Sequence, residues 1–87
     1  VQHFKRTMET EKDLRDNPTL FLYEIIGVAK HSESREPLMV YKTLYTAHNC
    51  KTGEIYVRPY KMFCSKVDKS KSPEAKQEYR FEIFRGL

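Results

Sequence analysis

The chain has 87 residues, the size of one small domain built around a single core. A chain of this length buries only about 60% of its unfolded surface, which leaves little room for a deep catalytic pocket. No apolar run approaches the length of a membrane span, and no stretch has the order of a signal peptide. We therefore expect one domain over residues 1–87, cytoplasmic and without a membrane partner, and we expect it not to be an enzyme.

Two cysteines, Cys50 and Cys64, are too few for a disulfide-dense scaffold, and we interpret them as free thiols in a reducing compartment. A structural zinc site needs four Cys or His ligands in closely spaced pairs. The chain offers only the pair His48 and Cys50 at short range. The sequence therefore predicts no metal site and no cofactor.

The net charge of +4 is concentrated in one segment, residues 58–72. The segments on either side of it each sum to zero charge. Within it only Asp68 opposes five basic residues, which are Arg58, Lys61, Lys66, Lys69 and Lys71.

The N-terminal residues 1–5 alternate apolar and polar side chains and are typical of a short edge strand. Residues 6–19 are charged and tolerate a helix, with Thr10 and Asp13 spaced like a capping box. Pro18 disfavours helical geometry at the preceding residue. We expect residues 6–19 to form a surface insertion, either a short helix or a mobile loop.

Residues 20–32 are the longest apolar run and favour a strand, because they are rich in β-branched and aromatic side chains. Apolar residues on both sides of the pleat predict that this strand is covered on both faces for part of its length. Gly27 interrupts the run, which indicates a bulge or bend.

The rest of the chain predicts further short antiparallel strands separated by polar turns. Pro59 suits the start of a single helical turn over residues 59–64, in which Met62 and Phe63 would close one end of the core. Residues 65–76 are expected to be a solvated loop. The predicted strands are residues 38–45, 54–58 and 77–84, the last with Tyr79, Phe81 and Ile83 on its buried side. At this length a mainly β fold, a small curled barrel that hides its edges, is the economical arrangement.

Several motifs resemble one family in order along most of the chain. They are His3-Phe4-Lys5, Tyr23-x-Ile25-Ile26-Gly27-Val28-Ala29-x-His31-Ser32-Glu33, Val40-Tyr41-x-x-Leu44-Tyr45, Tyr56-Val57-Arg58-Pro59-x-x-Met62-Phe63 and Arg80-Phe81. Together they resemble the bacterial DUF1653 family. The resemblance implies an SH3-like small antiparallel β-barrel of about five strands, bacterial and cytoplasmic, and it implies no activity.

Two departures from the family pattern bear on function. Residues 6–22 lie between the His-Phe-Lys motif and the long strand, where family members have little more than a glycine turn. Tyr56 stands where the family commonly has tryptophan, which weakens any stacking role at that position.

The run His31-Ser32-Glu33 contains the residue types of a hydrolase triad. Consecutive residues point in different directions, so they seldom bring a nucleophile within hydrogen-bond reach of its base. We interpret the run as a turn whose Ser and Glu side chains bond nearby backbone amides. A small hydrolase using His31 and Ser32 is kept as an outlying alternative.

Tyrosines on a barrel face can stack on bases or grip a peptide, or they can be core packing whose hydroxyl reaches water. Arg58 would bind an anionic ligand, or pair with Glu24, Glu33 or Glu54 across the sheet. The candidate ligand-binding residues are Tyr41, Tyr45, Tyr56, Arg58 and His31, with Tyr60 as a further tyrosine of the same group.

Basic side chains beside aromatic ones are the combination that single-strand nucleic-acid binders use, although a lysine run is commonly only a solvated loop. The residues for this alternative are Arg58, Lys61, Lys66, Lys69 and Lys71. The main hypothesis is a non-enzymatic binding module for a peptide or protein partner. Single-stranded nucleic-acid binding is the alternative, and the oligomeric state is left open.

Overall fold

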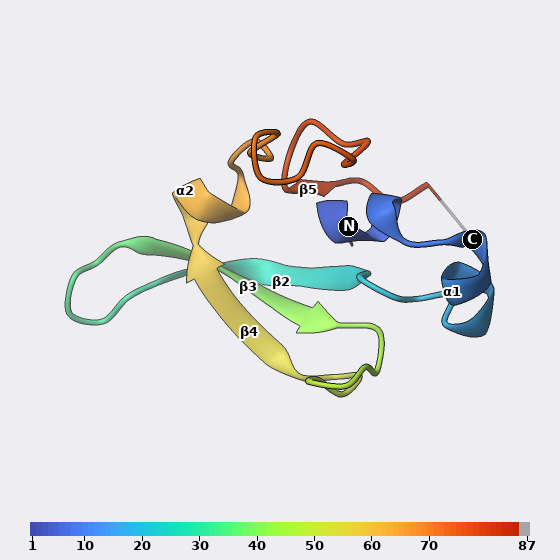
Figure 1. Cartoon of the computed structure of the whole chain (residues 1–87). Helices are drawn as coiled ribbons and strands as arrows, with labels where there is room; N and C mark the ends of the chain where they lie inside the picture. The colour runs from blue at the N-terminus through green and yellow to red at the C-terminus, as the bar shows by residue number, and fades with distance from the viewer. Residues whose placement is uncertain (86–87) are drawn as a thin grey trace.

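The computed structural model describes residues 1–85, which form mostly short antiparallel strands with a few short helices (Figure 1). A three-stranded sheet has the order β2-β3-β4, and a two-stranded sheet pairs β1 with β5. The predicted mainly β class is confirmed. The elements in chain order are β1 (Gln2–His3), the 3-10 helix η1 (Phe4–Met8), α1 (Glu11–Asp16), β2 (Tyr23–Lys30), β3 (Pro37–Thr43), β4 (Ile55–Pro59), α2 (Tyr60–Phe63) and β5 (Phe81–Glu82).

The strands do not close into a barrel within residues 1–85, so the five-stranded SH3-like barrel is not confirmed. The two sheets meet through β1, where Gln2 forms an isolated bridge with Leu22. Tyr23 N also donates to the Val1 carbonyl oxygen at 2.9 Å. Because β1 and β5 have only two residues each, this contact is too short to continue as a ladder and join the sheets.

The long strand β2 pairs antiparallel with β3 and contains the predicted bulge. Ile25 lies opposite Tyr41, and Gly27 lies opposite the next residue, Val40, so Ile26 is the extra residue. The expectation that this strand is covered on both faces is wrong, because Ile26 is 51% and Val28 59% exposed. The cause is position: β2 is an edge of its sheet, and its hairpin with β3 extends away from the rest of the molecule (Figure 1).

The main core lies against one face of the three-stranded sheet, which we call the inner face. Phe63 and Phe81 stack with ring centroids 4.0 Å apart, and Tyr41 and Met39 of β3 pack with them. The predicted helical turn after Pro59 is present, but Met62 is exposed and only Phe63 closes the core. The predicted strand over residues 77–84 shortens to β5.

Along this C-terminal segment, Phe81 is buried whereas Tyr79 and Ile83 are exposed. The reason is that β5 pairs with β1 over two residues only. The strand therefore does not extend to Tyr79 and Ile83, and the alternation in the sequence does not determine which of their side chains are buried.

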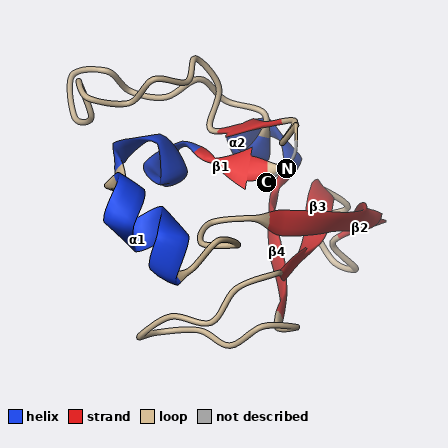
Figure 2. Cartoon of the chain, turned by 90° about the vertical axis from the view of Figure 1, so that its right-hand side faces the viewer, coloured by secondary structure: helices blue, strands red, loops and turns tan. Residues whose placement is uncertain are grey.

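A second, smaller core joins the 3-10 helix η1 to the segment before β5. Phe4 packs with Val67 and Ala75, so the expectation that residues 65–76 are only solvated loop is partly wrong. The helical form of the N-terminal insertion is present as α1, whose N-cap Thr10 accepts a hydrogen bond from Asp13 N at 3.1 Å. Figure 2 shows α1 on the side of the molecule away from β2, β3 and β4.

Candidate functional site

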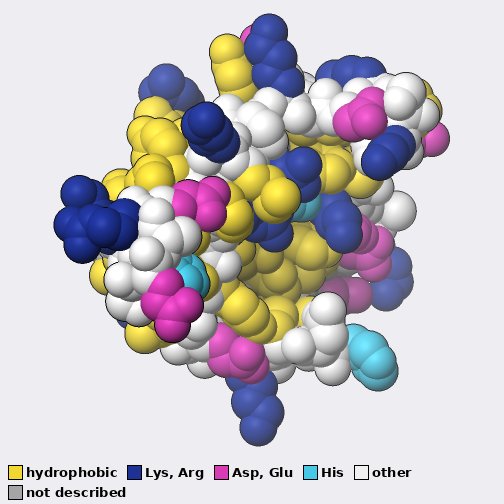
Figure 3. All heavy atoms as spheres, turned by 90° about the vertical axis from the view of Figure 1, so that its left-hand side faces the viewer, with side chains coloured by type: hydrophobic (Ala, Val, Ile, Leu, Met, Phe, Trp, Pro, Cys, Tyr) yellow, Lys and Arg dark blue, Asp and Glu magenta, His cyan; other side chains and the backbone are white. Residues whose placement is uncertain are grey.

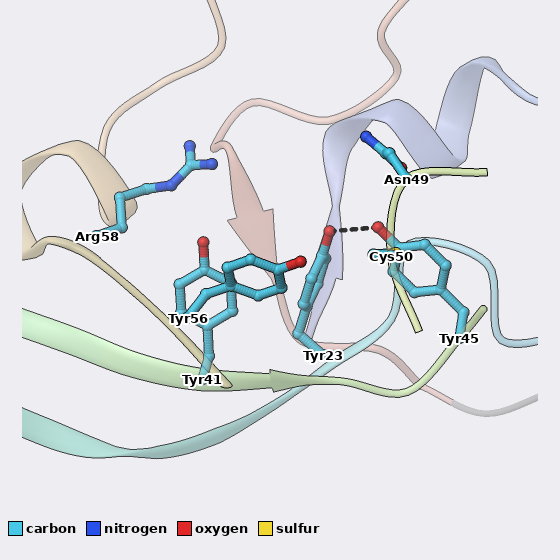
Figure 4. Close-up of a pocket in the computed structure, with 7 residues that line it drawn as sticks. All are labelled: Tyr23, Tyr41, Tyr45, Asn49, Cys50, Tyr56 and Arg58. Atoms are coloured by element: carbon cyan, nitrogen blue, oxygen red, sulfur yellow. Dashed lines mark hydrogen bonds between the residues drawn. The ribbon is translucent and has the colours of Figure 1, made fainter. Parts of the chain in front are cut away.

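A cavity of about 210 Å³ opens on the inner face of the three-stranded sheet. Its lining is aromatic, with one positive charge and one amide, and it joins all three strands to the loop between β3 and β4 (Figure 4). The lining residues are Tyr23, Tyr41, Tyr45, Asn49, Cys50, Tyr56 and Arg58. The structure thus brings four of the five predicted ligand-binding residues to one place.

Strand register places a row of three tyrosines across the sheet. Tyr41 of β3 lies opposite Tyr56 of β4, and Tyr23 of β2 lies opposite Thr43, two residues further along β3. Residues two apart on a strand share a face, so the three rings project to the same side. Their ring centroids are 5.3 Å (Tyr23 to Tyr41) and 6.1 Å (Tyr41 to Tyr56) apart.

The floor of the cavity holds a hydroxyl pair. The Tyr23 and Tyr45 oxygens lie 2.7 Å apart, and either can donate (Figure 4). Burial raises the pKa of both phenols, so both stay neutral. Tyr41 and Tyr45 are each only 5% exposed. Their rings are therefore core packing. Of the candidate tyrosines, Tyr56 and Tyr60 are exposed, and only Tyr56 lines the cavity.

The loop after β3 supplies Asn49 and Cys50, and buried Thr43 holds it in place. The Thr43 hydroxyl donates to the Lys51 carbonyl oxygen at 2.6 Å and accepts from Glu54 N at 3.1 Å. Ala47 N donates to the Cys50 carbonyl oxygen at 2.9 Å and closes the turn. Asn49 and Arg58 approach the cavity from opposite sides (Figure 4).

Arg58 has no carboxylate within ion-pair distance among residues 1–85. Two of the expected acidic partners are engaged elsewhere: Glu24 lies 3.8 Å from Lys42, and Glu54 accepts from the Tyr56 hydroxyl. The third, Glu33, lies in the exposed turn between β2 and β3. The guanidinium carbon of Arg58 lies 5.6 Å from the ring centre of Phe81. Arg58 thus brings an uncompensated positive charge to the rim of an aromatic cavity.

A buried histidine, His3, lies in the core near this charge. Burial, and next the positive charges of Arg58, Lys5 and Arg80, lower the pKa of His3 to about 3. His3 Nδ1 accepts a hydrogen bond from Lys5 N at 3.2 Å. His3 is therefore a neutral core residue at physiological pH.

Tyr56 forms the open lip of the cavity and is 36% exposed. Its hydroxyl donates to Glu54 Oε2 at 2.7 Å, which fixes the ring against the edge of the sheet. The same hydrogen bond lowers the pKa of Glu54 and raises the pKa of Tyr56 to about 12. Tyr56 is therefore a neutral, preoriented aromatic surface beside the Arg58 guanidinium.

The side chains of the lining set the chemistry that the cavity offers. Its described lining contains tyrosine, asparagine, cysteine and arginine. His48 and Glu54 line an adjoining hollow that shares Asn49 and Cys50 with the cavity. What the lining offers is flat apolar area, phenol and amide hydrogen-bonding groups, and one guanidinium fork.

His31, the fifth predicted ligand-binding residue, lies in the turn between β2 and β3 and is not part of the cavity lining. Its Nδ1 accepts from the backbone N–H groups of Glu33 and Ser34, each at 3.2 Å. The run at 31–33 is thus a hydrogen-bonded turn, with the imidazole bonding the backbone amides in place of the Ser and Glu side chains expected for that role.

The basic segment does not form one continuous charged surface. Lys66 lies 3.2 Å from a Glu78 carboxylate oxygen, and Lys69 Nζ donates to the Ala75 carbonyl oxygen. Lys61 and Lys71 are exposed, and only Arg58 reaches the cavity. Figure 3 shows basic side chains dispersed over one face among acidic and uncharged ones, around a hollow with a hydrophobic floor.

Sequence reasoning missed Tyr23, Asn49 and Cys50 as lining residues. Tyr23 lies in the longest apolar run, where the sequence pattern does not distinguish a core residue from one that lines a cavity. Its distance along the strand from the bulge determines which face of the sheet it occupies. A cysteine buried inside an otherwise polar turn was the one available indication for the loop residues.

Among residues 1–85, no three His, Cys, Asp or Glu side chains come together in a way that would hold a metal ion. Of the helices described there, none is long and apolar enough to cross a bilayer.

Fold and site define a small antiparallel β domain with an aromatic cavity that carries an arginine. A family model described as a protein of unknown function, DUF1653, matches residues 1–83. The chain belongs to this family, as its motifs predicted. No curated protein and no solved structure matches it.

Proposed function

We propose that the protein is a non-enzymatic binding module that recognises a peptide or an exposed segment of a protein partner. One observation carries the proposal: the Arg58 guanidinium, which has no carboxylate partner among residues 1–85, lies at the rim of a cavity lined by four tyrosines. A guanidinium fork matches a carboxylate in geometry and charge. The recognised segment would place a carboxylate near Arg58 and pack an apolar group on Tyr56.

The size of the cavity supports a segment of chain as ligand. Pockets for drug-sized molecules and cofactors measure roughly 300–1,000 Å³. A cavity of about 210 Å³ suits a single side chain or a chain terminus. An aromatic cage would also attract an alkylammonium group, but the charge of Arg58 opposes any cationic ligand. Cys50 and Cys64 are free thiols, which persist in a reducing compartment, so we propose the cytoplasm as the location of the protein.

The test is an amide-shift NMR titration of the isotope-labelled protein with a pool of random hexapeptides that carry free C-terminal carboxylates. The same pool with amidated C-termini, and an acidic hexapeptide subset, serve as comparisons. We expect shifts at the cavity residues, strongest for pools with available carboxylates. Because one or two charges are involved, the affinity should respond only weakly to salt.

Three variants decide whether the cavity is responsible. Tyr56→Ala and Arg58→Gln should each abolish the shifts, because they remove the exposed ring and the free charge. Tyr79→Ala is the matched control: Tyr79 is similarly exposed, at 42% against 36%, and does not line the cavity. Titrations in which all three variants behave alike would contradict the proposal.

A second arm uses a mixed-sequence single-stranded oligonucleotide at low and at physiological salt. Shifts over residues 58–71 that collapse with salt, together with silent peptide pools, would replace the peptide proposal with nucleic-acid binding. No shifts with any probe would contradict both ligand classes.

A further inference from the structure

The strand β4 leaves apolar side chains and one edge uncovered. Ile55 is 64% and Val57 57% exposed on the outer face of the sheet. Within residues 1–85, β4 has a neighbouring strand, β3, on one side only. Such an edge presents unpaired N–H and C=O groups that can template pairing with another strand.

Proline gives the direction of these backbone groups. Pro59 has no N–H and, within a sheet, is tolerated where its nitrogen faces the free edge. Ile55 and Val57 have the same parity as Pro59 along β4, so their N–H and C=O groups also point away from β3. The free edge therefore presents two residues with complete hydrogen-bonding capacity, and Pro59 ends the row.

The sequence of this edge is complementary to itself when it is read antiparallel. With Tyr56 opposite Tyr56 of a second copy, Ile55 lies opposite Val57, and Glu54 lies opposite Arg58. Opposite residues of an antiparallel pair share a face. The apolar pair would lie on the outer face, and the opposite charges on the inner face.

We propose that two copies of the protein associate through β4, antiparallel and two-fold symmetric about Tyr56, with Glu54 of each copy paired with Arg58 of the other. Ile55 and Val57 exchange four N–H···O=C hydrogen bonds across the axis. The two three-stranded sheets become one six-stranded sheet. The pairs of Ile55 with Val57 then cover apolar surface that is bare in the single chain.

Neighbouring registers lack this complementarity. Sliding the second copy by two residues in one direction sets Arg58 opposite Tyr56 and Glu54 opposite Tyr60. Sliding it the other way sets Glu54 opposite Tyr56 and Val57 opposite Gly53. Because only the register centred on Tyr56 pairs both charges and both apolar residues, the edge selects a second copy in one geometry.

Existing contacts prepare Glu54 for this role. Its carboxylate is already held on the inner side of the edge by the Tyr56 hydroxyl and by Lys51 N at 2.8 Å. Arg58 has no competing carboxylate among the described residues. A guanidinium has five N–H donors, so a carboxylate of the second copy leaves donors for a ligand in the cavity. Dimer and peptide binding are thus separate claims, and the first is tested on the protein alone.

The test is sedimentation equilibrium of the full chain over a concentration series. The unmodified protein should show a monomer–dimer equilibrium. Glu54→Arg and Arg58→Glu should each weaken association by at least about tenfold, because each places like charges opposite one another. The double variant, Glu54→Arg with Arg58→Glu, restores the pairing with reversed polarity and should recover most of the association.

Glu33→Arg is the matched control, since it reverses an exposed charge in the turn between β2 and β3 and should leave association unchanged. A second measurement needs no variant. In a sample mixed from labelled and unlabelled protein, intermolecular NOEs should join the methyl groups of Ile55 and Val57. A monomer at all concentrations up to about 1 mM would overturn the proposal, and so would a dimer that neither single reversal weakens or that lacks these NOEs.

Discussion

The two faces of the three-stranded sheet differ sharply although the same strands build both. On the inner face Tyr41 and Phe81 are buried in an aromatic core, while on the outer face Ile55 and Val57 stand in solvent. The difference arises because β5, α2 and the N-terminal segment all pack against the inner face. Hydrophobicity alone therefore does not tell which residues stabilise this fold. What decides is which face the rest of the chain reaches.

The largest contrast is expected between truncations on the two faces. Phe81→Ala should lower the free energy of unfolding by about 3–5 kcal/mol, because it removes the ring stacked on Phe63. Val57→Ala should change it by less than about 0.5 kcal/mol, since an exposed side chain leaves no cavity. Urea denaturation followed by circular dichroism, at low protein concentration, measures both. Equal losses would show that the outer face is covered in solution.

The pH dependence of stability tests the inner core. The pKa of His3 is about 3 in the folded chain and about 6.5 when unfolded, so below pH 6.5 the unfolded chain binds a proton that the folded chain does not. The free energy of unfolding should therefore decrease as the pH is lowered below 6.5, by up to about 1.4 kcal/mol per pH unit. The loss from His3 should reach roughly 2–3 kcal/mol at pH 4.5.

Protonation of carboxylates also changes stability in this pH range, so the readout is a comparison of variants. His3→Gln should remove the part of the slope that comes from His3, as judged by urea denaturation between pH 7 and 4.5. His31→Gln, an exposed control, should keep it. Identical slopes in all three proteins would contradict a neutral, buried His3.

The floor of the cavity should show a coupled effect of intermediate size. Tyr23→Phe and Tyr45→Phe should each cost about 0.5–1.5 kcal/mol, because each leaves the other hydroxyl without its partner. The double variant should cost less than the sum of the two. Tyr79→Phe, at an exposed site, should have little effect. Strict additivity in thermal or urea unfolding would show that the hydroxyl pair is not formed.

Local patterns in the sequence predicted the local features of the fold. The cap at Thr10, the bulge at Gly27 and the helical turn after Pro59 depend on residues close in the chain, and all three are present. The open arrangement of the sheets depends instead on how far β1 and β5 pair, which no local pattern encodes.

The candidate site divides in the same way. Tyr56 and Arg58 are two residues apart on one strand, so their side chains lie on the same face of the sheet. Their common position in the cavity lining therefore follows from sequence spacing. Asn49 and Cys50 reach it only because Thr43 anchors their loop, a contact between segments that sequence spacing does not reveal.

The smallest effects are expected at two glycines, one in the loop between β3 and β4 and one at the bulge of β2. Gly53, in the loop that closes the cavity, has φ +91°, so Gly53→Ala should destabilise by about 1 kcal/mol through backbone strain. Gly27, at the bulge of β2, has no positive φ, and an added Cβ would meet no atom within 4 Å. Gly27→Ala should therefore be neutral or slightly stabilising, by less than about 0.5 kcal/mol. Urea midpoints measured side by side resolve the two, and a larger loss at Gly27 would mean that the bulge requires glycine for a reason other than backbone conformation or space.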